Sequence, residues 1–225
     1  QHLIDANGNI SRIYNSLSFR EGRGEGVAFL DDYANIIDAF IALYEVTFDV
    51  SWLNRAKALA DKAVSHFYDP DKGIFFYTGD SGEQLIARKS EILDGVIPSS
   101  NSVMARNLKK LGLLFDEENY TAISAQMLQN IFPLIAKYGS SYSNWAALLQ
   151  EEVFGIYEFA LTGPNALTLR KEIEEKYIPN KIMLGGNTEN LPLLQGRVGV
   201  QTCIYICKDK TCGLPVDRVE DALKQ

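Results

Sequence analysis

Three aspartates have the residue type and the position along the chain for acid–base chemistry. Asp31 and Asp32 precede one amphipathic stretch, and Asp94 precedes another. Glycoside hydrolysis uses two carboxyl groups, about 5–5.5 Å apart when configuration is retained and about 6.5–9.5 Å apart when it is inverted. Asp32 and Asp94 are therefore candidate catalytic residues, provided that the fold brings their carboxyl groups together.

Side chains suited to holding a sugar lie near these aspartates in the sequence. Aromatic rings can stack on a sugar ring, and polar side chains can bond its hydroxyl groups. The candidate substrate-binding residues are Asp31, Tyr33, Phe76, Tyr77, Arg88, Ser99 and Asn101.

A structural role explains the same residues without any ligand. Short side chains that carry an oxygen cap the free amides at helix N-termini, which fits both Asp31-Asp32 and residues 99–102. The aromatic residues of a β-hairpin can pack on helices, and Arg88 or Asp94 can form an ion pair that anchors a loop. The sequence leaves both roles open.

The histidines argue against one form of sugar chemistry. Epimerisation next to a carbonyl needs well-placed bases, and the chain has two histidines, His2 and His66. His2 lies in the lead-in to the first helix, and His66 lies near the end of a predicted outer helix, where packing or exposure is the common role. An epimerase that uses two histidines is therefore disfavoured within this chain.

The three cysteines do not have the spacing of a metal site. Cys203 and Cys207 share one face of a predicted strand, and Cys212 follows, which lacks the paired C-x-x-C spacing of zinc sites. The spacing favours a packed Cys203 and a structural or redox-capable pair of Cys207 and Cys212. We predict neither a metal nor a cofactor.

Composition narrows the classes of partner. The net charge of −7 argues against binding to nucleic-acid phosphates or to an anionic membrane. No apolar run approaches the roughly 18 residues of a membrane-spanning helix, and no signal peptide opens the chain, so we expect a cytoplasmic protein.

The glycine-rich residues 22–26 do not indicate a phosphate-binding loop, because no strand precedes them. The chain starts without Met, and we expect a fragment of a longer protein.

Apolar residues with helical spacing predict three helical hairpins. The pairs are residues 30–48 with 51–67, 103–115 with 120–138, and 141–161 with 165–177. Ser51 is the expected cap of its helix. Repeated hairpins predict a mainly α fold over residues 29–178, an α/α toroid or part of one. In a ring, the inner helices start at the same end, so the polar clusters would meet at one rim with helix N-termini.

The remaining segments have a different character. The long connection before residue 99 predicts a β-hairpin, in which "GIFFYT" pairs with "QLIARK". Residues 179–225 predict a small α/β appendage, with strands in "KIMLGG" and "VQTCIYICK" and a short helix in "VDRVEDALKQ". Residues 1–28 form a lead-in segment.

Four stretches together resemble a known family: "FLDDYANIIDAFIALYEVTFDVSWLNRA", "GIFFYTGD", "LIARKSEILDGVIPSSNSVMARNL" and "IYICKDKTCGLPV". They are similar to the C-terminal part of the bacterial YyaL-type proteins and of the mammalian spermatogenesis-associated thioredoxin-domain protein. The resemblance covers nearly the whole chain. Ile74 stands where the family usually has Gly, and Ser100 where it often has Gly.

The resemblance implies an N-terminal thioredoxin-like domain, absent from this chain, and an (α/α)6 toroid similar to those of six-hairpin glycosidases and N-acylglucosamine 2-epimerases. This chain would hold the later hairpins. Two hypotheses follow: a carbohydrate is bound or altered in the toroid cavity, or the chain is a non-catalytic scaffold that presents or regulates the thioredoxin-like domain. The expected partners are that domain and the earlier hairpins. Helix faces without those hairpins would favour self-association.

Overall fold

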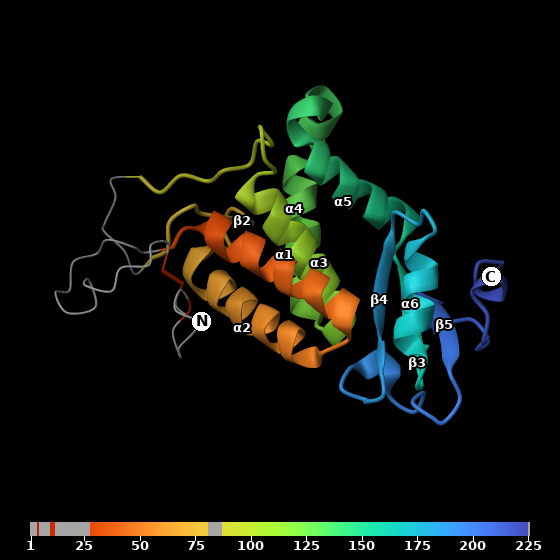
Figure 1. The fold of residues 1–225 in the computed structure, drawn as a ribbon. Helices are drawn as coiled ribbons and strands as arrows, with labels where there is room; N and C mark the ends of the chain where they lie inside the picture. Colours follow the sequence, from red (N-terminus) through yellow and green to blue (C-terminus); the bar gives the residue numbers. More distant parts are fainter. Residues whose placement is uncertain (1–3, 5–9, 12–27, 81–86, 225) are drawn as a thin grey trace.

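The computed structural model describes residues 4, 10–11, 28–80 and 87–224 (Figure 1). They form a helical part, built by α1 to α5, beside a small mixed sheet with its own helices. The prediction of a mainly helical chain is confirmed. The lead-in expected over residues 1–28 lies almost wholly outside the described residues. None of the helices in the described ranges has the length and apolar character needed to cross a membrane.

The first predicted hairpin is present as α1 (Leu30–Thr47) and α2 (Val50–Phe67). Phe48 ends α1 in the left-handed conformation, with φ 54°, and turns the chain into α2. The cap of α2 is Asp49, whose carboxylate accepts a hydrogen bond from the Ser51 amide at 2.9 Å. The prediction that Ser51 caps this helix is therefore wrong, because its amide is the group that is capped.

The second predicted hairpin is also present, as α3 (Ser100–Phe115) and α4 (Glu118–Lys137). The α3 helix packs on α4 and also along α1. The side-chain amide of Asn107 donates to the Ala34 carbonyl of α1 at 2.8 Å, and both residues are buried. A buried amide is costly unless it is bonded, so this contact also fixes the register of α3 against α1.

The third predicted hairpin is wrong. The sequence predicts a helix over residues 141–161, but α5 (Ser143–Phe154) stops before Gly155, whose φ is 74°. The next segment is a strand, β3 (Tyr157–Thr162). A short apolar run fits a helix or a strand equally well, and here pairing with strands on both sides decides for the strand. A closed ring of helical hairpins remains a prediction.

Four strands form one sheet in the order β4–β3–β5–β6. The strands β4 (Lys181–Gly186), β5 (Cys203–Lys208) and β6 (Thr211–Cys212) join β3, which is parallel to β4 and antiparallel to β5. The strands predicted in "KIMLGG" and "VQTCIYICK" are confirmed. The central strand comes from residues assigned to the hairpins, so the sheet spans the expected boundary at 178–179.

Helices cover one face of this sheet. They are α6 (Ala166–Glu174) and α7 (Val219–Ala222), which enclose a small apolar cluster with Phe159 and Leu161. The opposite face joins the main core through Ala160 and its neighbours. The short helix predicted in "VDRVEDALKQ" is confirmed as α7. Two single helical turns, η2 (Gly139–Tyr142) and η3 (Pro192–Leu194), complete the connections.

The β-hairpin predicted in the long connection has a different partner. The short strand β2 (Ile74–Phe75) pairs with β1 (Tyr68–Asp69), which directly follows α2. The predicted partner "QLIARK" lies partly outside the described residues, and residues 87–89 are not in a strand. They still contact the connection, because the Tyr77 amide donates to the Lys89 carbonyl at 2.7 Å.

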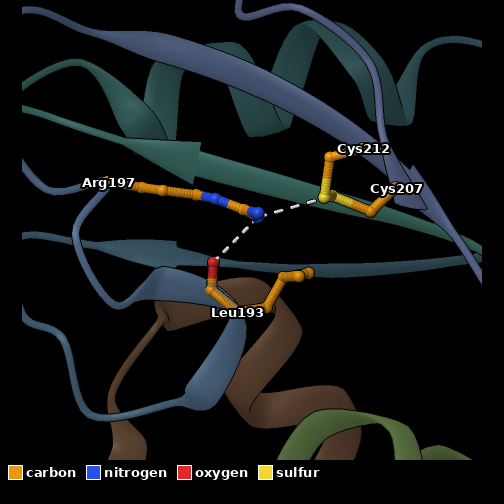
Figure 2. The surroundings of a disulfide bond; sticks show 4 residues. All are labelled: Leu193, Arg197, Cys207 and Cys212. Atoms are coloured by element: carbon orange, nitrogen blue, oxygen red, sulfur yellow. Dashed lines mark hydrogen bonds between the residues drawn. A yellow bond between two sulfur atoms is a disulfide. The ribbon is translucent and has the colours of Figure 1, made fainter. Parts of the chain in front are cut away.

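Cys207 and Cys212 form a disulfide, which confirms the predicted pairing (Figure 2). They are directly paired residues of β5 and β6. The turn between these strands is made by Asp209 and Lys210, both with positive φ. Such a two-residue turn matches the twist of a hairpin and holds the two cysteines opposite each other. Cys203 is a free, partly buried thiol.

Gly185 allows β4 to lie close to both β3 and α1. A Cβ atom here would overlap the Leu161 carbonyl oxygen and lie 2.9 Å from the Phe48 ring. We expect Gly185→Ala to lower the free energy of unfolding by about 1–3 kcal/mol, since backbone cannot move aside cheaply. Denaturant unfolding measures this. Gly199→Ala is the control, because a Cβ there meets no atom within 4 Å; equal effects of the two changes would contradict the prediction.

Candidate functional site

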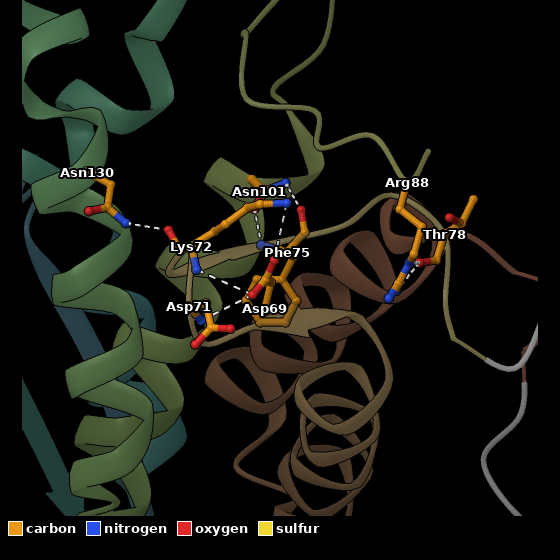
Figure 3. A network of polar contacts seen from close by, with 8 residues as sticks. All are labelled: Asp69, Asp71, Lys72, Phe75, Thr78, Arg88, Asn101 and Asn130. Carbon is orange, nitrogen blue, oxygen red and sulfur yellow. Dashed lines mark hydrogen bonds and ion pairs between the residues drawn. The ribbon is translucent and has the colours of Figure 1, made fainter. Parts of the chain in front are cut away.

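The candidate residues lie at one end of the helical part. The Leu30 amide, at the start of α1, donates to the Tyr77 carbonyl of the long connection at 3.0 Å. The Phe75 amide of the same connection donates to the side chain of Asn101, at the start of α3, at 2.9 Å (Figure 3). Both helices therefore start at the same end, as we expect for the first helices of the two hairpins.

Asp94 is a buried carboxylate that joins three segments. One oxygen accepts from the Ser99 amide at 2.9 Å and the Ser102 hydroxyl at 2.8 Å, and the other accepts from the Asn144 amide at 2.8 Å. The amide of Asp94 donates to the Ser141 carbonyl at 2.8 Å. With 8% of its surface exposed, Asp94 satisfies free amides at the starts of α3 and α5.

The polar cluster before α3 has the predicted capping role. The Ser99 hydroxyl accepts from the Ser102 amide at 3.3 Å, which caps α3. Asn101 is fully buried: its oxygen accepts from the Phe75 amide, and its nitrogen donates to the Phe75 carbonyl at 3.0 Å and the Glu91 carbonyl at 2.9 Å. One residue caps, and its neighbour pairs with the backbone of the connection.

Arg88 anchors the connection to the end of α2. Its Nε donates to the Thr78 carbonyl at 3.0 Å, and its Nη2 donates to the His66 carbonyl at 3.1 Å. Figure 3 shows Arg88 and Thr78 side by side. The guanidinium also lies 4.2 Å from the centre of the Phe76 ring, which the Lys72 ammonium approaches at 4.7 Å. Two cations therefore already contact the ring proposed to stack on a sugar.

The two aspartates at the start of α1 lie in its first turn, after the capping position. The Asp32 carboxylate accepts from the Phe29 amide at 2.9 Å, and the Asp31 carboxylate accepts from the Asp32 amide at 3.0 Å. These bonds satisfy amides at the helix N-terminus, where negative charge is favourable.

The two candidate tyrosines pack against other rings. Tyr33 is 5% exposed, and its ring lies 5.2 Å from the ring of Phe67. The Tyr77 ring stacks on Phe29 at 4.9 Å. Both contacts tie the start of α1 to neighbouring segments, which is the packing role that the sequence also allows.

The structure thus brings the candidate residues to one end of the helices, where their described contacts fasten segments together. Asp94, Asn101 and Arg88 bond mainly to backbone groups, which is how buried loops are held in place. Among the described residues, no group of three or more His, Cys, Asp or Glu side chains is arranged to hold a metal ion.

Glu158 of β3 is a buried acid that no pattern in the sequence singles out. It is 7% exposed and lines a pocket of about 500 Å³ between the α3–α4 turn, α5 and the β5–β6 hairpin. Burial raises the pKa of its carboxyl to about 7, and the carboxylates of Asp209 and Asp116 add to the rise. The helix predicted over residues 141–161 concealed that Glu158 lies in a strand, paired with β4 on one side and with β5 on the other.

No protein-family model matches the chain. The chain is 26% identical over 202 residues to mouse spermatogenesis-associated protein 20, an alignment that covers 84% of this chain and 26% of that protein. The human protein of the same name is 24% identical over the same share of each chain. An uncharacterized protein of Caenorhabditis elegans, B0495.5, is 24% identical over 97% of this chain and 32% of its own length. The chain is therefore homologous to spermatogenesis-associated protein 20 and spans about a quarter of that relative's length.

Proposed function

We propose that this chain is a non-catalytic helical scaffold of a longer protein, in which it presents or regulates an N-terminal thioredoxin-like domain. The observation that carries the proposal is the use of Asp94, Asn101 and Arg88 as anchors for the connection that crosses the starts of α1 and α3. Side chains whose polar atoms are already bonded to backbone groups of other residues are poorly placed for acid–base catalysis on a ligand.

The homology supports a longer protein, because the relatives extend far beyond the aligned segment. The thioredoxin-like domain and a complete (α/α)6 toroid belong to this proposal and follow from the family resemblance. In such a toroid, the earlier hairpins would cover helix faces of this chain, so the chain made alone would tend to self-associate.

Deleting residues 28–224 from the full-length protein is expected to change the rate at which its thioredoxin-like domain reduces a disulfide substrate. Steady-state turnover measures this, with the isolated thioredoxin-like domain as reference. The control is a full-length variant with Asp38→Ala, an exposed residue of α1. Identical turnover of the deleted and intact proteins would contradict the scaffold proposal.

A carbohydrate ligand at the same end of the helices is the second candidate. The position of Asp31, Phe76 and Tyr77 at the end where α1 and α3 both begin supports it, because helix N-termini offer free amides to a ligand. A panel of monosaccharides and glycans tests it by thermal shift of the full-length protein. A sugar at 100 times its Kd would add about 2.7 kcal/mol of stability. A shift with one sugar, lost in Asp31→Asn, would favour this candidate; no shift with any sugar would exclude it.

A further inference from the structure

The Cys207–Cys212 disulfide has two ionisable neighbours that a purely structural disulfide does not need. Cys207 on β5 is paired directly with Glu158 on β3, so both side chains leave the sheet on the same face. Directly opposite residues of antiparallel strands have Cβ atoms about 4.5–5.5 Å apart. The Glu158 carboxyl is therefore a neighbour of the Cys207 sulfur.

Arg197 approaches the same sulfur from the segment after η3. Its Nη1 lies 3.5 Å from Cys207 Sγ and also donates to the Leu193 carbonyl at 3.0 Å (Figure 2). The guanidinium lies 5.1 Å from the centre of the Tyr205 ring. These contacts hold a permanent positive charge at Cys207, which stabilises a thiolate there.

Glu158 is an unpartnered acid among the described residues: none of them gives its carboxyl a hydrogen bond or an ion pair. Around the pocket that it lines, Lys109 pairs with Glu152 at 2.7 Å and Lys210 pairs with Asp116 at 2.7 Å. The remaining charged groups there are Glu117, Glu118 and Asp209.

The charges that act on Glu158 have both signs. Asp209 and Asp116 add to the effect of burial, whereas Arg197 and Lys210 oppose it, and the pKa of its carboxyl is raised to about 7. Near neutral pH, Glu158 can therefore give up a proton or take one back.

The two sulfurs differ in access. Cys207 is fully buried, whereas Cys212 is partly exposed on β6, the last strand of the sheet. An attacking thiolate reaches Cys212, and the sulfur that leaves is Cys207, which is the one beside Arg197. We propose that this disulfide is redox-active: it exchanges with a dithiol through attack at Cys212, Arg197 stabilises the Cys207 thiolate, and Glu158 protonates it.

The exchange is balanced as two substitutions. A thiolate of the dithiol bonds to Cys212 Sγ, the Cys207–Cys212 bond breaks, and its electron pair stays on Cys207, which takes the Glu158 proton. The second thiol of the dithiol then loses its proton, and its thiolate attacks the sulfur of the same dithiol that is bonded to Cys212. This releases Cys212 as a thiolate, and Cys212 and Glu158 each take up a proton from solvent. The dithiol is oxidised to a disulfide, and the two cysteines are reduced to thiols.

The first test compares the same disulfide in the folded and unfolded chain. The full chain with Cys203→Ser has the pair as its only cysteines, and mass spectrometry after alkylation follows its reduction by dithiothreitol. We expect the folded chain to react at least as fast as the chain in 6 M guanidinium chloride. Reduction that occurs only on unfolding would overturn the proposal. Glutathione should form its mixed disulfide on Cys212; a mixed disulfide on Cys207 would also overturn it.

The second test assigns the two neighbours. Arg197→Met should slow reduction by about 3–10-fold through a poorer leaving thiolate, and Arg197→Lys should restore part of the rate. Arg218→Met, which removes an exposed cation, is the control and should leave the rate unchanged. Equal rates for the Arg197 and Arg218 variants would remove Arg197 from the proposal.

Glu158 is tested by the pH profile. In the chain that keeps Glu158, the rate of reduction divided by the concentration of dithiothreitol thiolate should fall between pH 6 and 8. The reason is that an ionised Glu158 cannot protonate Cys207 and repels its thiolate. The same profile should be flat in Glu158→Gln. A purely structural role for Glu158 would leave the two profiles parallel, and that result would overturn its part in the exchange.

Discussion

Replacing Asp94 by alanine is expected to lower the free energy of unfolding by about 3–5 kcal/mol, the largest effect of any change considered, because it leaves buried donors without a partner. The carboxylate accepts from the Ser99 and Asn144 amides and from the Ser102 hydroxyl, all at 2.8–2.9 Å. These donors begin α3 and α5. Their loss therefore loosens two helices and the connection between the hairpins together.

Chemical denaturation of the chain measures this effect. Asp94→Asn is the informative companion, because it keeps the shape but supplies only one acceptor oxygen, and it should fall between the wild type and Asp94→Ala. Asp38→Ala is the control, since Asp38 is an exposed aspartate of α1. A change of less than about 1 kcal/mol for Asp94→Ala would be smaller than the loss of a single cap and would remove the anchoring role.

Glu158→Gln is expected to stabilise the chain at pH 8 by about 2–3 kcal/mol and to change it little at pH 4, since one pKa unit corresponds to about 1.4 kcal/mol. The sign follows from the direction of the shift. Burial raises the pKa of the folded carboxyl to about 7 from an ordinary value of 4.5. Between these two values the unfolded chain has lost the proton that the folded chain keeps, so stability falls as the pH rises through this window. Above it, the cost of ionising the buried acid is constant.

Unfolding of the oxidised chain at pH 4, 6 and 8 measures this dependence. The quantity to compare is the difference in free energy of unfolding between Glu158→Gln and the wild type, because other groups titrate equally in both. Glu172→Gln is the control, since Glu172 is an exposed acid on α6. A difference that stays constant from pH 4 to 8 would mean that Glu158 ionises at its ordinary pH in the folded chain.

The helical hairpins could be predicted because their information is local. In α1 to α4, one apolar side chain every three or four residues defines the buried face, and the pattern is interrupted where one helix ends and the next begins, as at Asp49. The strands β4 and β5 could also be predicted, as short apolar runs, and the pairing of Cys207 with Cys212 could be predicted from their closeness along the chain.

Local pattern failed where non-local pairing decides. Residues 157–162 are almost continuously buried, and such a run has no period that separates a helix from a strand. The strand forms because β4 and β5 supply backbone partners on both sides. With the strand missed, Glu158 could not be recognised as the residue opposite Cys207.

For the candidate site too, one part could be predicted from the sequence and another part could not. The sequence by itself determined that polar residues gather before α3 and that a carboxylate and a cation lie in the long connection. Residue types and helix-capping signals depend only on positions that are close together in the chain. Only the tertiary structure decided their partners: Asp94 bonds to α5, Asn101 to β2, and Arg88 to the end of α2. The physical reason is that a buried polar group must find a partner, and the nearest one in space can be far along the chain.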